Sequence, residues 1–218
     1  MLLEVRGAVK RFRRGTEVIA ALDGVDLDVG AGEFVALYGP SGSGKSTLIH
    51  LGAGLDDPDD GVIRLDGRDL ATCSTRERAK IRRQRVGLVF QFFHLLPALT
   101  VTENVELPLL LDGRTPNGLT AGLLERVGLT DRARHLPGEL SGGQLQRAAI
   151  ARALVTEPSL ILADEPTGNL DSATGATVLD VLETAVRESG AGMLLVTHDE
   201  GVAARADRVV RLRDGRFE

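Results

Sequence analysis

The chain has 218 residues, and its 26 Lys and Arg against 31 Asp and Glu give a formal net charge of −5. With 43% hydrophobic and 26% charged residues, the composition is that of an ordinary globular protein able to build a sizeable core. The acidic balance argues against nucleic acid as a partner, because phosphate backbones are bound by clustered positive charge. The single cysteine, Cys73, excludes an internal disulfide and favours a reducing compartment.

The sequence shows neither a secretion signal nor a membrane span. Residues 1–14 lack the apolar run of a signal peptide. The longest uncharged stretch, Val86–Thr102, contains Gln91, His94 and Pro97, which makes it a poor spanning helix. We therefore expect a soluble protein that works at a membrane only if another protein brings it there.

Short β-rich runs alternate along the chain with segments of helical pattern. The β-rich runs predict strands at residues 2–9, 18–20, 25–29, 33–38, 62–65, 86–90, 160–163, 193–197 and 208–212. The helical patterns predict helices at 45–51, 74–85, 142–155 and 174–188. Buried apolar strands that alternate with helices indicate an α/β fold with parallel strands.

Residues 92–156 differ from the rest of the chain. This stretch is helix-rich, contains no convincing strand and is punctuated by Pro97, Pro108, Pro116 and Pro137. We interpret it as a helical lobe inserted into one domain, 1–218, whose sheet-containing part comprises about residues 1–91 and 157–218. Residues 112–118 are the best candidate for an exposed loop.

Residues 39–46 match the phosphate-loop pattern G-x-x-x-x-G-K-[ST], and an apolar strand precedes them while a helical run follows. Glycines let successive backbone N–H groups face one phosphate chain, and the helix start adds unpaired N–H groups. Lys45 can neutralise the terminal phosphates, and the Ser46 hydroxyl can bind Mg²⁺. The residues predicted to bind a nucleoside triphosphate are Gly39, Pro40, Ser41, Gly42, Ser43, Gly44, Lys45 and Ser46.

Two carboxylates follow the apolar strand at residues 160–163. Asp164 ends the strand, where it would hold the magnesium shell beside a phosphate loop. Glu165 lies one residue further, where it would act as general base towards an attacking water. The alternative is that both acids cap the next helical turn.

Two further strands end in polar residues, with Gln91 after 86–90 and His198 after 193–197. Ligands of open α/β sheets bind outside the carboxyl ends of the strands. We therefore expect Gln91 to bind the metal or orient water, and His198 to contact the terminal phosphate. Taken singly, each side chain is also explained as a polar cap at a strand end.

A second glycine motif, Leu-Ser-Gly-Gly-Gln at 140–144, opens the predicted helix at 142–155. Ser141 is a suitable N-cap, and the glycines expose N–H groups at the helix start. Simple helix capping is the alternative, for which two glycines in the first turn are a poor choice. A phosphate supplied by another copy of the protein explains them better.

Over almost its whole length the chain resembles the ATP-binding-cassette (ABC) ATPases. The matching motifs, in the family's order, are the phosphate loop 39–46, Gln91, the signature 140–144, Asp164-Glu165, Asn169-Leu170-Asp171 and His198. The resemblance implies a P-loop NTPase fold with a mostly parallel central sheet, an N-terminal antiparallel β subdomain and an inserted helical lobe. It also implies an enzyme that binds ATP with Mg²⁺ and hydrolyses the ATP.

The resemblance further implies a head-to-tail dimer with two ATP molecules at the interface. Each ATP would lie between residues 39–47, including Thr47, of one copy and Ser141, Gly143 and Gln144 of the other. Asp171 would lie at the dimer seam. Phe12 matches the aromatic residue that stacks on adenine, although a core or hairpin aromatic is an alternative interpretation.

Residues 89–108 and 164–171 are similar to those of one branch, the lipoprotein-release and macrolide-export ATPases (LolD/MacB type). That branch works beneath an integral-membrane permease, which implies a cytoplasmic protein held at the membrane's inner face. Phe92, Phe93, Leu95 and Leu96 are then candidates for a groove that receives a permease helix, or else belong to the lobe's core. The short loop at 112–118 and Leu145 depart from the branch.

A transporter ATPase subunit is thus the leading hypothesis. A regulatory or scaffolding ATPase of a membrane complex, such as a cell-division complex, would have the same site and differ only in its partner. A phosphotransferase is opposed by the signature motif. A DNA-repair or translation protein is opposed by the single cassette and the acidic balance.

Overall fold

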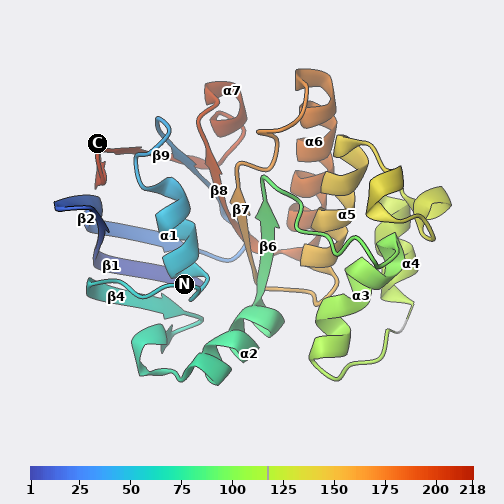
Figure 1. Ribbon diagram of the computed structural model, residues 1–218, viewed down its shortest axis with the longest axis horizontal. Coiled ribbons are helices and arrows are strands. Elements are labelled where there is room, and N and C mark those ends of the chain that lie inside the picture. The colour runs from blue at the N-terminus through green and yellow to red at the C-terminus, as the bar shows by residue number, and fades with distance from the viewer. Residues whose placement is uncertain (117) are drawn as a thin grey trace.

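The computed structural model describes residues 1–116 and 118–218 and contains two sheets (Figure 1). The central sheet has the strand order β10-β9-β3-β8-β7-β6, and the second sheet has the order β2-β1-β4-β5. The strands are β1 (Leu3–Arg14), β2 (Glu17–Val29), β3 (Phe34–Tyr38), β4 (Asp60–Leu65), β5 (Arg68–Asp69), β6 (Val86–Phe90), β7 (Leu160–Asp164), β8 (Gly192–Thr197), β9 (Arg208–Arg213) and β10 (Arg216–Phe217).

The helices cover both faces of the central sheet. They are α1 (Lys45–Gly52), α2 (Thr75–Arg85), α3 (Val101–Leu111), α4 (Leu119–Arg126), α5 (Gly142–Leu154), α6 (Ser172–Ser189) and α7 (Glu200–Ala203), with 3₁₀ turns η1 (Leu70–Thr72), η2 (Thr130–Arg132) and η3 (Pro137–Glu139). In Figure 1, α1 lies with β1, β2 and β4 to the left of β6–β8, and α3–α6 lie to the right.

Strands β9, β3, β8, β7 and β6 pair in parallel, and only β10 is antiparallel to its neighbour. The second sheet is antiparallel throughout. Helices α3, α4 and α5 pack together beside the central sheet. The predicted α/β class, with a mostly parallel sheet, an N-terminal antiparallel β subdomain and a helical lobe, is confirmed.

The central strands are apolar on both faces because each face covers a separate core. In β7, Leu160 and Leu162 belong to the core shared with α1 and the antiparallel sheet. Ile161 and Ala163 belong to the core shared with α3–α6. A strand that is buried on both sides is expected to be apolar throughout, which is why the motif strands are continuous apolar runs.

The antiparallel sheet is longer than its sequence indicates. Residues 18–20 and 25–29, predicted as separate strands, form one strand, β2, which pairs with β1 along its length. The register shifts between Val5 and Ala8, and Gly24 adopts φ +76°, so bulges let the hairpin continue past irregular residues. The charged residues Lys10, Arg11 and Arg13 lie in β1 because this end of the hairpin is partly or fully exposed to solvent.

Local capping chemistry fixes the ends of the predicted helices. Ser74 and Glu77 form a reciprocal capping box at the start of α2. Thr100 and Glu103 do the same for α3, a helix that continues through Pro108. In the predicted loop at 112–118, Asn117 lies outside the described residues. Among the described helices, none combines the length and the apolar character needed to cross a bilayer.

Candidate active site

The carboxyl ends of four parallel strands meet at one edge of the central sheet. Tyr38 at the end of β3 pairs with Thr197 at the end of β8. Asp164 at the end of β7 pairs with Val196 on one side and with Phe90, at the end of β6, on the other. The segments that follow these strands therefore start side by side, in the order phosphate loop, His198, Glu165 and Gln91.

The phosphate loop is wedged between two other parts of the backbone. A Cβ atom on Gly39 would lie 2.1 Å from the carbonyl oxygen of Leu212 in β9. A Cβ atom on Gly44 would lie 2.0 Å from the carbonyl oxygen of Ala21 in β2, and Gly44 also adopts φ +106°. Gly42 has open space around it but adopts φ +82°. Three glycines of the motif are thus required by the fold itself.

Lys45 folds back onto its own loop. Its Nζ donates hydrogen bonds to the carbonyl oxygens of Gly39 at 2.8 Å and Pro40 at 2.9 Å. The residue is 5% exposed, and this burial lowers the pKa of its ammonium group. An anion bound in the loop would compensate the cost of burying this charge, which favours binding of a terminal phosphate.

Ser46 and Asp164 form a contact between α1 and β7. The Ser46 hydroxyl donates a hydrogen bond to Asp164 Oδ1 at 3.0 Å. Burial raises the pKa of Asp164, and the bond from Ser46 acts in the opposite direction. A partly buried carboxylate next to a hydroxyl is a suitable donor pair for a hard divalent cation.

Glu165 connects the sheet edge to His198 and Lys45. Its two carboxylate oxygens lie 2.9 and 3.0 Å from His198 Nδ1, and Oε1 lies 4.0 Å from Lys45 Nζ. The backbone takes φ +48°, and the Glu165 N–H donates to the Val196 carbonyl oxygen at 3.0 Å. This turn carries the side chain off the strand, as expected of a group that approaches the terminal phosphate.

Gln91 is held by a residue that sequence reasoning did not single out. Its Nε2 donates to Asn169 Oδ1 at 3.2 Å, and Asn169 Nδ2 donates to the Gln91 carbonyl oxygen at 3.0 Å. A Cβ atom on Gly168 would lie 2.8 Å from Gln91 Nε2. Gln91 thus contacts the 167–171 segment in this structure. The position of Asn169 within the Asn-Leu-Asp motif was the available signal.

Residues 141–144 begin α5 with a capping box. Within the single chain, their contacts are therefore those of simple helix capping. The Ser141 Oγ accepts from the Gln144 N–H at 3.4 Å, and Gln144 Oε1 accepts from the Ser141 N–H at 2.9 Å. Among the described residues, no hydrogen bond or ion pair joins them to the phosphate loop. A Cβ atom on Gly143 would lie 2.4 Å from Thr174 Cγ2, so this glycine also has an internal role.

The remaining predicted site residues lie away from the strand ends. Asp171 caps α6 by accepting from the Thr174 N–H at 3.0 Å, and hydrogen bonding by Thr174 lowers the pKa of the Asp171 carboxyl. Phe12 is 46% exposed on the β1–β2 hairpin, and Lys10 Nζ lies 5.5 Å from its ring centroid. An exposed ring here is open to stacking, and the core alternative for Phe12 does not describe this environment.

The segment after Gln91 is exposed rather than buried. Phe92 is 66% and Leu96 is 47% exposed, whereas Phe93 and Leu95 are partly buried and only Leu95 packs against the lobe's core. A groove of about 360 Å³ lies between α2, β6, α3 and α5, and Phe92, Phe93, Leu95 and Leu96 are not among the residues that line it. Leu111, which is 64% exposed, lines this groove.

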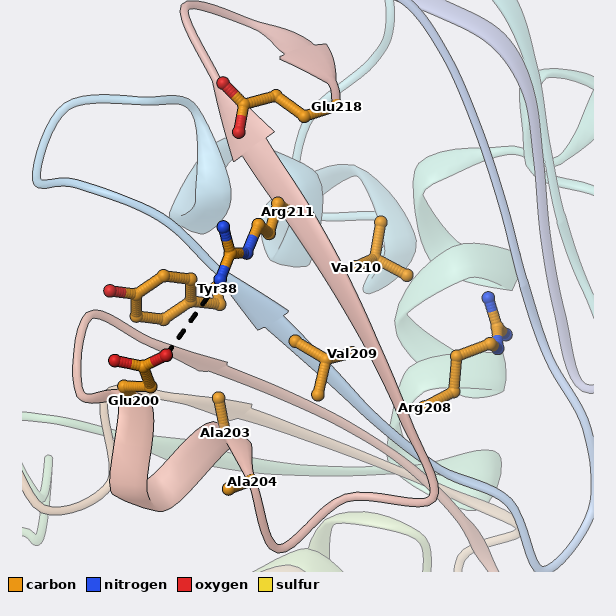
Figure 2. Close-up of a pocket in the computed structure, with 9 residues that line it drawn as sticks. All are labelled: Tyr38, Glu200, Ala203, Ala204, Arg208, Val209, Val210, Arg211 and Glu218. Carbon is orange, nitrogen blue, oxygen red and sulfur yellow. Dashed lines mark ion pairs between the residues drawn. The ribbon is translucent and has the colours of Figure 1, made fainter.

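A second hollow, of about 500 Å³, lies between β3, β9 and α7 (Figure 2). The Arg211 guanidinium lies 5.7 Å from the centroid of the Tyr38 ring and forms an ion pair with Glu200 at 3.9 Å. None of the predicted nucleotide-binding side chains lines it. We therefore assign the chemistry to the sheet edge and not to this hollow.

A phosphate loop, a partly buried aspartate and a glutamate–histidine pair at one edge of a parallel sheet define a P-loop ATPase. The sequence model of the family described as "ABC transporter" matches residues 22–168. The chain belongs to the ABC transporter family and is an ATP-binding and ATP-hydrolysing subunit of a transporter, as its sequence predicts.

Curated relatives support this assignment. The chain is 46% identical to the lipoprotein-releasing system ATP-binding protein LolD of Chromohalobacter salexigens, over 100% of this chain and 93% of the relative. It is 49% identical to the macrolide export ATP-binding/permease protein MacB 1/2 of Paracoccus denitrificans, over 99% of this chain but only 33% of that longer protein.

Solved structures give the same result. The dimeric structure of MJ0796, described as a bacterial ABC transporter cassette, has a TM-score of 0.91 and 42% identity, and the match covers 99% of this chain and 96% of that chain. A dimeric post-hydrolysis state of MJ0796 bound to ADP and Pi also has a TM-score of 0.91, with 41% identity. ATP or ADP is therefore the ligand class of the site.

Proposed function

We propose that this chain binds ATP as one half of a head-to-tail dimer. Each of two ATP molecules would lie between residues 39–47 of one copy and Ser141, Gly143 and Gln144 of the second copy. The main support is that α1 and α5 pack into the separate cores on opposite faces of the central sheet. One chain therefore presents its two helix-start anion sites on different sides, and a second copy would bring them together. The structure of MJ0796, which is described as dimeric, supports a dimer.

Mg²⁺ fits the donors at the edge of the sheet. Ser46 Oγ and Asp164 Oδ1 lie 3.0 Å apart, and burial raises the pKa of the partly buried Asp164, so a bound cation would favour its charged form. The described residues contain no cluster of three or more metal-binding side chains. This agrees with Mg²⁺, which usually takes few protein ligands and completes its shell with phosphates and water. Gln91 would join the shell after leaving Asn169.

Glu165 is the residue proposed to take a proton from the attacking water. His198 would orient the Glu165 carboxylate through the 2.9 Å contact and then contact the terminal phosphate. Lys45, which donates to Gly39 and Pro40 here, would redirect its donors to the bound phosphates. Bound Mg²⁺ would neutralise the charge that develops on the phosphates. Positioning and electrostatics would thus supply most of the catalysis.

Two further residues would complete the nucleotide site. The exposed ring of Phe12 on the hairpin would stack on adenine, and Lys10 Nζ lies 5.5 Å from the ring centroid. Asp171 would lie at the seam of the dimer, where the start of α6 meets the second copy. Both assignments rest on the sandwich arrangement, since each residue is exposed in the single chain.

We further propose that an integral-membrane permease holds the protein at the cytoplasmic face of the membrane. The groove between α2, β6, α3 and α5 would receive a helix of that permease, because the exposed Leu111 lines it. Arg152 of the groove also donates to the Phe93 carbonyl oxygen in the segment that carries the exposed Phe92 and Leu96. The helical lobe, residues 92–156, would transmit motion between this groove and the sheet-containing part, about 1–91 and 157–218. The curated names LolD and MacB are the comparison that supports a permease partner.

The Glu165→Gln variant tests this mechanism. We expect it to bind ATP, to hydrolyse ATP at a small fraction of the wild-type rate, and to accumulate as a dimer in the presence of ATP and Mg²⁺. The amide keeps the shape of the side chain but is a very weak base. Phosphate release and light scattering with size exclusion measure the two effects. Glu188→Gln, an exposed carboxylate paired with Arg126 on the surface, is the matched control.

A variant that stayed monomeric with ATP and hydrolysed ATP at the wild-type rate would overturn both the sandwich and the role of Glu165. A dimer that still hydrolysed ATP normally would retain the sandwich and remove Glu165 as the base.

A further inference from the structure

The groove beside the helical lobe combines apolar walls with arginines. Its apolar lining includes Leu88 and Phe90 of β6 and Leu107 and Leu111 of α3. Three arginines also line it, namely Arg82 and Arg83 of α2 and Arg152 of α5. Burying a cation in an apolar groove costs free energy unless the cation is paired. An arginine of the groove that lacks a carboxylate partner therefore indicates that the groove binds a negatively charged group.

One of the three arginines already has a carboxylate partner. Arg83 Nε lies 3.1 Å from Asp112 Oδ1, and Gln84 also donates to this carboxylate at 3.0 Å. This cluster joins α2 to the end of α3 and neutralises the charge of Arg83. Arg83 is thus an arginine of this groove that is paired with a carboxylate, and the contacts of the other two arginines can be compared with it.

Arg82 and Arg152 contact only backbone carbonyl oxygens. Arg82 Nη1 donates to the Gly54 carbonyl oxygen at 3.2 Å. Arg152 Nη2 donates to the Phe93 carbonyl oxygen at 2.8 Å, and its Nη1 donates to that of His94. Within residues 1–116 and 118–218, neither guanidinium has a carboxylate within ion-pair distance.

Burial leaves these charges uncompensated. It lowers the pKa of both Arg82 and Arg152, and no neighbouring acid acts to raise either value. A guanidinium has five N–H donors, so Arg152 retains donors beyond its two carbonyl contacts. Arginine presents such donors in a planar fork that matches a carboxylate.

We propose that the permease helix received by this groove carries an Asp or Glu on its apolar face, which pairs with Arg152. Arg82 lies on the same groove and adds to the positive potential. The proposal rests on the proposed function, since it specifies the chemistry of the segment that docks there. Charge complementarity selects this occupant, because a purely apolar helix would cover the partly buried Arg152 guanidinium and leave it without a carboxylate partner.

The position of Arg152 gives the pairing a further role. Its donors hold the carbonyl groups of Phe93 and His94, two and three residues after Gln91 in the chain. A carboxylate that draws the guanidinium towards the groove competes with these carbonyls. Docking would therefore weaken the hydrogen bonds by which Arg152 holds the segment that follows Gln91.

Two synthetic peptides test the inference. Each is an amphipathic helix of about 14 residues, roughly four turns, with one central position that is Glu in one peptide and Gln in the other. Fluorescence anisotropy measures their binding to the full chain and to Arg152→Gln. We expect the Glu peptide to bind wild type about tenfold tighter than the Gln peptide, a difference just below the couplings measured for close interfacial charge pairs. In Arg152→Gln this preference should disappear.

The ratio of the two affinities separates pairing from structure. A variant that merely deforms the groove weakens both peptides equally, whereas loss of a charge pair weakens only the Glu peptide. Arg147→Gln is the matched control, since Arg147 lies on the same helix and also donates to backbone carbonyls, those of Val127 at 2.8 Å and Gly128 at 3.4 Å. Arg147→Gln should keep the tenfold preference, and Arg152→Lys should keep part of it.

Equal binding of the two peptides to wild type would overturn the pairing and leave the docking groove intact. Failure of both peptides to bind would overturn the groove as a docking site. Arg152-dependent binding to vesicles of phosphatidylglycerol, with no preference between the peptides, would assign the arginines to lipid phosphate and overturn the proposal. The ATP-dependent dimerisation of Glu165→Gln is independent of all three outcomes.

Discussion

The Gly143→Ala substitution separates two explanations of the second glycine motif. If the glycine only leaves room for a phosphate from another copy, alanine should stabilise the isolated chain. Glycine in a helix is about 1 kcal/mol less favourable than alanine. The structure predicts the opposite sign, because the new Cβ would lie 2.4 Å from Thr174 Cγ2.

The magnitude follows from the contact. Overpacking by one methyl group typically costs about 1–3 kcal/mol, and the gain in helix propensity offsets up to about 1 kcal/mol of it. We expect Gly143→Ala to lower the free energy of unfolding by about 1–2 kcal/mol. Thr174→Ser removes the opposing methyl group and keeps the backbone N–H that Asp171 caps. In that background Gly143→Ala should be neutral or stabilising.

Urea unfolding of the nucleotide-free chain, followed by circular dichroism, measures all four members of this cycle. Gly142→Ala is the comparison within the motif, because its Cβ would meet only the flexible end of Leu170 at 3.2 Å. Greater stability of Gly143→Ala in the wild-type background, or a loss that Thr174→Ser does not rescue, would refute the packing argument.

Three other substitutions have expected outcomes. Asp164→Asn should raise the melting temperature of the nucleotide-free protein at neutral pH. Because the pKa of Asp164 is raised in the folded chain, ionisation of this carboxyl above that pKa lowers the stability of the fold. The increase in melting temperature should therefore become smaller as the pH is lowered. An increase that calorimetry finds constant with pH would contradict this explanation. Asn104→Ala should lower the free energy of unfolding in urea by about 2–3 kcal/mol. The substitution removes the Oδ1 atom that accepts a hydrogen bond from the Leu96 N–H at 2.7 Å. An unchanged midpoint would show that water replaces the amide. Lys45→Ala should weaken ATP binding roughly 10- to 100-fold in a titration with a fluorescent analogue, and unaltered affinity would remove it from the phosphate site.

Much of the fold could be predicted because its signals are local. The strand that precedes the phosphate loop and the strand that ends at Asp164 are continuous apolar runs bounded by polar residues. Parallel strands place their carboxyl ends together, so the adjacency of Lys45, Glu165 and His198 follows from the class of fold. The 4.0 Å and 2.9 Å contacts among them agree with that reasoning.

What could not be predicted depends on contacts between distant residues. Gly143 meets Thr174 across two helices, and no local pattern encodes that distance. Gln91 pairs with Asn169, which lies 78 positions further along the chain, and no local pattern encodes that contact. The hairpin formed by β1 and β2 runs through charged residues because its end is exposed to solvent, which removes the apolar alternation that marks a strand.

The wedged phosphate loop has a consequence for how this sequence can diverge. Gly39 and Gly44 face main-chain oxygens, of Leu212 and Ala21, which every amino acid carries. No substitution at a neighbouring position can therefore create room for a side chain, so neither glycine can be replaced. At Gly143 the obstacle is a side chain, so for folding alone a prior change at Thr174 can reopen that position.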